Sequence, residues 1–342
     1  SLTRMQPGHA NVSSWRGTHP ARPIRLQAAA FTPGAAWQKS TAVQNFPYGE
    51  RSNQITGSPV TNAKLGGMSL LDLEPLLRVP YVEPDLGFDI SLDGSQLAIS
   101  WNKSGRWEIY LQDINQDSPP CQITNGAGAK FAPRWKPDGS QLAYVLDIDG
   151  SENYDIIIHD LSTGTQTNIT ENTTDALASS FAWSPGGSQI AFCSDRAGRF
   201  DTYIMPSQGG EARIVLDQHH PDWEVSWSPD GRTLAVTSEG EGHDYWTFLV
   251  PLAGGQPTSI SIDNSPIPAK DACWSPDGRS LAFASNLHGQ FQIAIYEVAS
   301  GGITWLTDGQ GEKEYPDWSQ DGFLTYVISH GPKSELAVME IA

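Results

Sequence analysis

The sequence predicts an all-β protein: a six-bladed β-propeller of four-stranded antiparallel blades, complete or part of a larger propeller. A tight turn, usually Pro-Asp-Gly, joins two short apolar strands six times, as in the stretch 273–286 (CWSPDGRSLAFASN). Successive turn glycines are 45, 48, 44, 47 and 44 residues apart, which is the period of propeller blades. These glycines are Gly94, Gly139, Gly187, Gly231, Gly278 and Gly322.

Each repeat supplies four strand candidates. The first strand ends in a large apolar residue four positions before the turn glycine, and the second carries a Leu-Ala-aromatic pattern, as in 142–144. A third strand alternates, as in 154–161, and a short edge strand follows, as in 303–307. The residue that ends the first strand is Ile90, Trp135, Trp183, Trp227, Trp274 or Trp318. Period-two alternation places these indoles between neighbouring sheets, so we interpret the five tryptophans as blade core.

The last repeat has candidates for three strands, near 315–319, 323–329 and 335–341, and none for a fourth. Either the extended segment 78–83 pairs there and closes the ring, or the sequence has been cut. Because natural proteins avoid unpaired sheet edges, closure by segment 78–83 is the prediction for a chain that stands alone.

The first 67 residues differ in composition from the rest. They hold seven Lys or Arg and one acid, Glu50, whereas residues 68–342 hold 14 basic and 38 acidic residues. We expect segment 1–67 to be disordered or non-native and the propeller to occupy 68–342. One interpretation of the segment is an organelle transit peptide; the other, which we favour, is that Met68 is the true start.

The overall composition excludes several classes of function. A formal net charge of −18 argues against a nucleic-acid partner, and no stretch has the roughly 20 apolar residues of a membrane span. We therefore expect a cytoplasmic protein with neither nucleic-acid nor membrane partners. The three cysteines lie in different repeats and are expected to be buried free thiols. No cofactor motif is present, and we expect neither a metal nor a cofactor.

The pattern WSPDG-x-x-L-A-F-x-S, followed by D-R-x-G as in 194–205 (SDRAGRFDTYIM), resembles the WD-type repeat of TolB propellers and of propeller domains in the prolyl oligopeptidase family of serine peptidases. The resemblance covers about 88–342, and the possible start at Met68 favours the peptidases. In that family a C-terminal α/β-hydrolase domain carries the triad, and the propeller covers it and restricts substrate size. The resemblance therefore implies a hydrolase domain and peptide substrates as partners.

This sequence contains no G-x-S-x-G elbow, so we predict that the chain itself has no catalytic residue and filters substrates for a hydrolase domain missing from it. Whether the parent protein is an enzyme stays open; a serine peptidase is the favoured interpretation. The alternative is a TolB-like scaffold that binds a protein or peptide partner.

Two loops could carry binding chemistry. In some members of the family an acidic pair on the propeller binds a substrate's free amino terminus, and the acidic stretch 238–246 offers Glu239, Glu241, His243 and Asp244 for such a gate. A solvated loop is the simpler interpretation. The stretch 217–224 offers His219, His220 and Asp222 as metal-ligand types, but no further ligand has a recognisable spacing, and we expect a loop.

Overall fold

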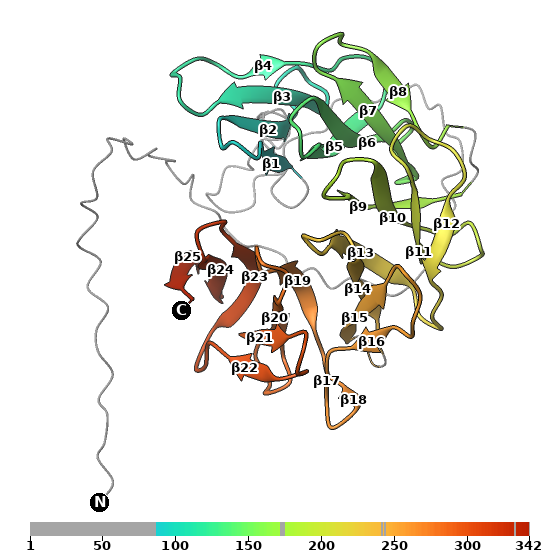
Figure 1. Cartoon of the computed structure of the whole chain (residues 1–342). Helices are drawn as coiled ribbons and strands as arrows, with labels where there is room; N and C mark the ends of the chain where they lie inside the picture. The colour runs from blue at the N-terminus through green and yellow to red at the C-terminus, as the bar shows by residue number, and fades with distance from the viewer. Residues whose placement is uncertain (1–86, 172–174, 241, 243, 332, 342) are drawn as a thin grey trace, which may run out of the picture.

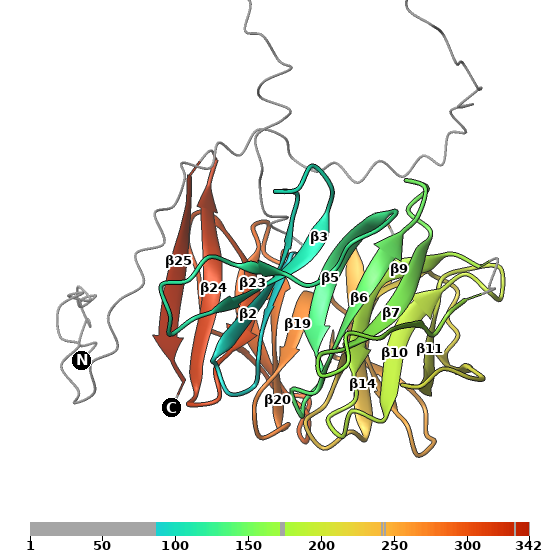
Figure 2. The same cartoon turned by 90° about the horizontal axis from the view of Figure 1, so that it is seen from above.

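In the computed structural model, which describes residues 87–171, 175–240, 242, 244–331 and 333–341, six antiparallel sheets follow one another along the chain. They stand side by side around one axis, so the protein is an all-β six-bladed propeller, as the sequence predicted (Figure 1). Figure 2 shows the ring from its side, with the strands running between its two faces.

Five blades have four strands in simple up-and-down order. Blade 1 comprises β1 (Phe88–Ile90), β2 (Gln96–Trp101), β3 (Glu108–Asp113) and β4 (Cys121–Gln122). Blade 2 comprises β5 (Ala129–Trp135), β6 (Gln141–Asp147), β7 (Tyr154–Asp160) and β8 (Gln166–Asn168). Blade 3 comprises β9 (Leu177–Trp183), β10 (Gln189–Ser194), β11 (Asp201–Pro206) and β12 (Arg213–Leu216). Blade 4 comprises β13 (Asp222–Trp227), β14 (Thr233–Glu239), β15 (Tyr245–Pro251) and β16 (Thr258–Ser259). Blade 5 comprises β19 (Lys270–Trp274), β20 (Ser280–Ser285), β21 (Gln292–Glu297) and β22 (Ile303–Trp305).

Blade 6 has three strands in the described part of the chain: β23 (Glu312–Trp318), β24 (Phe323–His330) and β25 (Lys333–Glu340). The segment expected to supply a fourth strand, 78–83, lies outside the described residues, as does the boundary expected at Met68. A small hairpin that the sequence analysis did not foresee, β17 (Ser261–Ile262) with β18 (Ser265–Pro266), joins blades 4 and 5. Its turn residues Asp263 and Asn264 have φ of 50° and 64°, as a two-residue type I′ turn requires.

The recurring turn between the first and second strands explains the repeated Ser-Pro-Asp-Gly. In blade 5 the Gly278 N–H donates to the Ser275 carbonyl over 2.9 Å, and the Asp277 carboxylate accepts from the Ser275 hydroxyl and the Arg279 N–H. All six turn glycines have φ between 66° and 90°. Residues that carry a side chain adopt this region only at a cost in free energy, whereas glycine adopts it readily.

The core lies between the blades, where each inner strand presents its indole to the preceding blade. Trp135, Trp183 and Trp227 are each 8% exposed, and their Nε1–H groups donate to the backbone oxygens of the preceding inner strand: Asp89 at 3.3 Å, Arg134 at 3.1 Å and Ala182 at 3.1 Å. Trp274 and Trp318 are only half-buried, and among the described residues their Nε1–H groups have no acceptor. We call the side chain that each inner strand inserts against the preceding blade its wedge. The wedges Trp135, Trp183 and Trp227 are therefore packed more tightly than Trp274 and Trp318.

The junction between blades 6 and 1 is the least packed. Ile90 holds the position of the tryptophans but is 50% exposed, and its neighbour Phe88 is 55% exposed. Across the junction, Leu336 and Val338 of β25 are 72% and 62% exposed. Among the residues that the structure describes, the apolar side chains on both sides thus lack the partners that their equivalents have elsewhere.

The cysteines follow the strand pattern only in part. Cys193 is buried and Cys273 half-buried, but Cys121 is exposed because β4 is an outer edge strand, so the expectation of three buried thiols was wrong for Cys121. No helix in the described residues has the length and apolar character needed to cross a bilayer.

Replacing Trp183 by Phe should destabilise the protein more than replacing Trp318 by Phe. Both changes remove similar ring volume, but only Trp183 loses a buried hydrogen bond and leaves the Arg134 carbonyl without its donor. We expect the free energies of unfolding in urea to differ by about 1 kcal/mol. Equal losses in the two variants would contradict the hydrogen-bonded wedge.

Candidate functional site

One face of the ring, which we call the gate face, collects the beginnings of the inner strands and the loops between the second and third strands. Backbone hydrogen bonds tie these two sets together from blade to blade: Lys130 N–H to Trp107 O, Asp222 N–H to Phe200 O, Ala269 N–H to Tyr245 O, and Lys313 N–H to Phe291 O, all between 2.7 and 3.1 Å. Loop residues of one blade are therefore fixed beside the inner strand of the next.

The acidic loop that was considered as a gate stands on this face. Glu239 ends β14 and its N–H donates to the Pro221 carbonyl at 2.8 Å, while the N–H of Gly240 donates to the Asp244 carbonyl at 2.6 Å. Glu239 and Asp244 are thus brought to the two sides of one tight turn, and both are half-buried. Glu241 and His243, the other two predicted gate residues, lie outside the described residues.

Next to this loop, blades 5 and 6 form a charged cluster that the sequence analysis missed. The Lys270 ammonium lies 2.6 Å from Glu314 Oε1 and 3.4 Å from Asp271 Oδ2. It also lies 4.4 Å from the ring centre of Phe291 and 5.5 Å from that of Tyr315, within cation–π range. The Tyr315 ring is the exposed member of the set.

The cluster could have been found from the repeat itself. Lys270 and Glu314 each stand four residues before the tryptophan of their inner strands, so they hold the same position in adjacent blades. Equivalent positions of adjacent blades are neighbours at the axis, because inner strands follow one another around it (Figure 1).

Two strained residues mark the same place. Asp271 and Tyr315 have φ of 54° and 56°, in a region that costs free energy for residues with a Cβ. Each lies within a register shift of its inner strand, an irregularity that locally disrupts the strand pairing and bends the strand. The same strain occurs at Ala132 of blade 2, which also stands three residues before the tryptophan of its inner strand.

The electrostatics of the cluster favour a fixed cation. Burial by itself lowers the pKa of Lys270, but Asp271 and Glu314 outweigh it, and the pKa lies above its ordinary value. Burial raises the pKa of Asp271 even though Lys270 and the Tyr315 N–H oppose this change. Lys270 is therefore held as an ammonium whose charge the two acids neutralise.

A second pair of acids faces across the junction of blades 6 and 1. Asp89 and Asp317 stand immediately before Ile90 and Trp318 in their inner strands. Desolvation raises the pKa of both, and the charge of Asp317 raises the pKa of Asp89 further. The Asp89 carboxylate accepts the Trp135 backbone N–H at 2.7 Å and interacts with Arg134.

The residues considered as metal ligands do not converge. Asp222 begins β13 instead of lying in a loop, because it inserts between blades 3 and 4, where it accepts hydrogen bonds from Ser238 at 2.5 Å and Thr202 at 2.7 Å. The centres of the His220 and Trp246 rings lie 5.5 Å apart, and the two rings are nearly perpendicular. The described residues contain no group of three metal-ligand side chains that could hold an ion.

Replacing Asp222 by Asn should change how stability depends on pH. Burial, partly offset by the Ser238 and Thr202 hydroxyls, raises the pKa of Asp222 from 3.8 to about 6. Because the folded pKa is the higher one, its stabilising contribution is complete below pH 3.8 and is lost as the pH rises through 6. From pH 4 to pH 7 the native protein should lose about 2 kcal/mol relative to the Asn variant.

Urea unfolding of both proteins at a series of pH values measures this difference. Groups common to both proteins cancel in the comparison, so parallel pH profiles would show that folding leaves the pKa of Asp222 unchanged and would contradict the prediction.

Replacing Lys270 by Met should lower the free energy of unfolding by about 2 kcal/mol, because Glu314 and Asp271 would keep partly buried charges without a cation. The control is Lys136→Met, whose ion-pair partner Asp138 is 56% exposed and should cost less than about 1 kcal/mol. Chemical denaturation of the two variants measures both losses, and a larger loss for Lys136→Met would contradict the assigned role of Lys270.

Residues 79–242 match the family model of the TolB beta propeller domain (PD40). The chain is 37% identical over 116 residues to the uncharacterized peptidase YuxL of Bacillus subtilis, a match that covers 32% of this chain and 17% of that protein. It is 28% identical over 184 residues to the Tol-Pal system protein TolB of Francisella tularensis, covering 52% of this chain and 41% of that protein. The matched stretches thus span less than half of each relative.

Solved structures confirm the architecture. An oligogalacturonate lyase in complex with manganese is similar with a TM-score of 0.65 at 18% identity, covering 76% of each chain. A puromycin-hydrolyzing peptidase of Mycobacterium tuberculosis is similar with a TM-score of 0.52 at 14% identity, covering 71% of this chain and 42% of that one. At such identities the likeness shows the fold alone, which is that of a β-propeller.

Proposed function

We propose that this propeller is the non-catalytic part of a prolyl oligopeptidase-like serine peptidase, in which it gates and filters peptide substrates for a hydrolase domain. The observation that carries the proposal is the position of the loop around Glu239 and Asp244. This loop is tied at one end to the inner strand of blade 4 and at the other to that of blade 5, beside the Lys270 cluster. The match to a relative described as a peptidase supports the same conclusion.

The physical role follows from charge and shape. Carboxylates in a partly desolvated loop attract an ammonium group, and the free amino terminus of a peptide carries one at neutral pH. Lys270 is already neutralised by Glu314 and Asp271, so it does not repel an incoming ammonium strongly. A peptide that approaches amino terminus first would therefore be held at the gate face.

A direct test compares two forms of one tetrapeptide, Ala-Pro-Phe-Ala amide, with a free or an acetylated amino terminus. Isothermal titration with this chain should show at least about fivefold tighter binding of the free form, equivalent to about 1 kcal/mol. The double variant Glu239→Gln, Asp244→Asn should remove the preference, and the double variant Asp113→Asn, Asp117→Asn on the rim of blade 1 should retain it.

The chain should not hydrolyse the same peptide in either form, because the proposal places the chemistry in another domain. Equal affinity for both forms, or cleavage by this chain, would contradict the proposal.

The second candidate is a TolB-like scaffold that binds a protein partner, favoured by the match over 184 residues to TolB of Francisella tularensis. A scaffold would bind its partner regardless of whether an amino terminus is free. Weaker binding of the acetylated peptide than of the free peptide therefore favours the peptidase propeller over the scaffold.

A further inference from the structure

A hollow of about 260 Å³ opens at the outer end of blade 5, bordered by Gln290, Trp305, Asp308 and Gly309. It belongs to the gate face, because Gln290 directly precedes Phe291, whose ring lies over the Lys270 ammonium. The other blades show why this hollow exists, since the repeat allows residues to be compared position by position.

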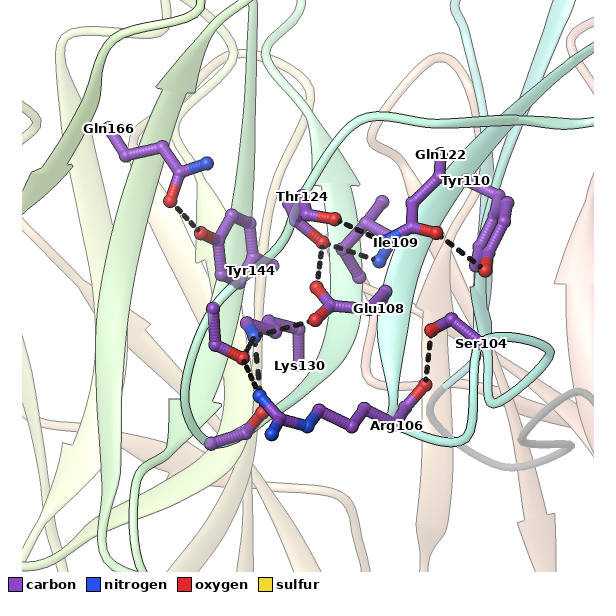
Figure 3. A network of polar contacts seen from close by, with 12 residues as sticks. Ser104, Arg106, Glu108, Ile109, Tyr110, Gln122, Thr124, Lys130, Tyr144 and Gln166 are labelled. Atoms are coloured by element: carbon purple, nitrogen blue, oxygen red, sulfur yellow. Dashed lines mark hydrogen bonds and ion pairs between the residues drawn. The ribbon is translucent and has the colours of Figure 1, made fainter.

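In blade 1 the equivalent place is occupied by an arginine. Arg106 lies in the loop between β2 and β3, and its Nη1 donates to the Gly126 carbonyl at 3.1 Å (Figure 3). Beneath it, the Thr124 hydroxyl accepts the Ile109 N–H at 2.8 Å, and the Lys130 ammonium donates to the same Gly126 carbonyl at 3.1 Å. We call this arrangement the arginine seat.

Blade 5 reproduces the frame of the seat. The Thr307 hydroxyl accepts the Ile293 N–H at 2.9 Å, as Thr124 does in blade 1. The Lys313 ammonium donates to the Gly309 carbonyl at 3.2 Å, as Lys130 does to Gly126. Each Lys also follows its Gly by four residues, so the two frames correspond along the sequence as well.

The arginine itself is missing from blade 5. Arg106 precedes the aromatic residue that stands immediately before the third strand, and Gln290 takes this position in blade 5. Glutamine is shorter and neutral, so it leaves space between the loop and Trp305, and the hollow is found at this place.

Blade 3 shows what an aspartate at the position of Asp308 does. There Arg199 is the equivalent arginine, and its Nη2 lies 2.7 Å from both Asp201 Oδ1 and Asp217 Oδ1. Asp217 stands five residues before Asp222, just as Asp308 stands five residues before Lys313 at the matching position of blade 5. Among the residues that the structure describes, no cation lies within ion-pair distance of the Asp308 carboxylate.

We propose that the empty seat of blade 5 binds an arginine side chain supplied by a peptide. A guanidinium fits because its planar fork pairs with a carboxylate, here Asp308, while its face stacks on an indole, here Trp305. The Trp305 ring is half-buried and lines the hollow. The centre of the His288 ring lies 4.8 Å from that of Trp305. The proposal rests on the proposed function for its choice of a peptide as ligand.

The probe is Nα-acetyl-arginine N-methylamide, and its matched control is the citrulline analogue, which keeps the shape but has no charge. Titration calorimetry with the full chain should give millimolar binding of the arginine probe and at least about fivefold weaker binding of the citrulline probe. Equal binding of the two probes would overturn the proposal.

Two variants locate the site. Asp308→Asn should weaken binding of the arginine probe at least about fivefold, whereas Asp117→Asn, the same change on an exposed loop of blade 1, should leave it unchanged. Gln290→Arg should fill the seat from within, abolish probe binding and raise the melting temperature. Retained binding by a folded Gln290→Arg protein would show that the probe binds elsewhere and would refute the assignment.

The test of the arginine seat can fail or succeed independently of the test of the proposed function. The arginine probe has no free amino terminus, so loss of the tetrapeptide preference with retained probe binding would refute the proposed function alone. Retained tetrapeptide preference without probe binding would refute the seat alone.

Discussion

The ring depends on one contact, the wedge that each inner strand drives into the preceding blade. A four-stranded sheet has two faces and cannot bury both by itself, so neighbouring sheets must cover them. Where the wedge is a tryptophan with a hydrogen-bonded N–H, as at Trp135, Trp183 and Trp227, the indole is nearly completely buried. Where the wedge is Ile90, half of the side chain stays exposed, and no core cluster of the described residues joins blades 6 and 1. The packing therefore weakens progressively around the ring.

The repeated scaffold makes departures from the repeat informative. The frame of the arginine seat is kept in blades 1 and 5 with nearly the same distances, yet only blade 1 fills it with an arginine of its own. The charged cluster around Lys270 arises in the same way, because an ordinary repeat position carries an ammonium in one blade and a carboxylate in the next. Stability is thus provided by what the blades share, and specific chemistry is provided by what distinguishes them.

Sequence patterns predicted the part of the structure that repeats. The turn glycines and the tryptophan spacing are local signals, so the blades and their strands could be assigned from them. The hairpin at Asp263 and Asn264 was missed because its strands have two residues each and no apolar alternation. The burial of Asp222 was missed because it depends on Thr202 and Ser238, which come from other strands. The acidic stretch 238–246 is visible in the composition, but the backbone turn that places Glu239 and Asp244 on its two sides is not.

The central claim is that contacts between blades set local stability, and native-state hydrogen exchange tests it most directly. The second strands of all blades are paired on both sides, so their amides differ mainly in how well the neighbouring blades pack. The account predicts that amides of β2 and β24, beside the open junction, exchange through openings of lower free energy than those of β10 and β14. Equal protection of all four strands, or stronger protection in β2 and β24, would contradict it.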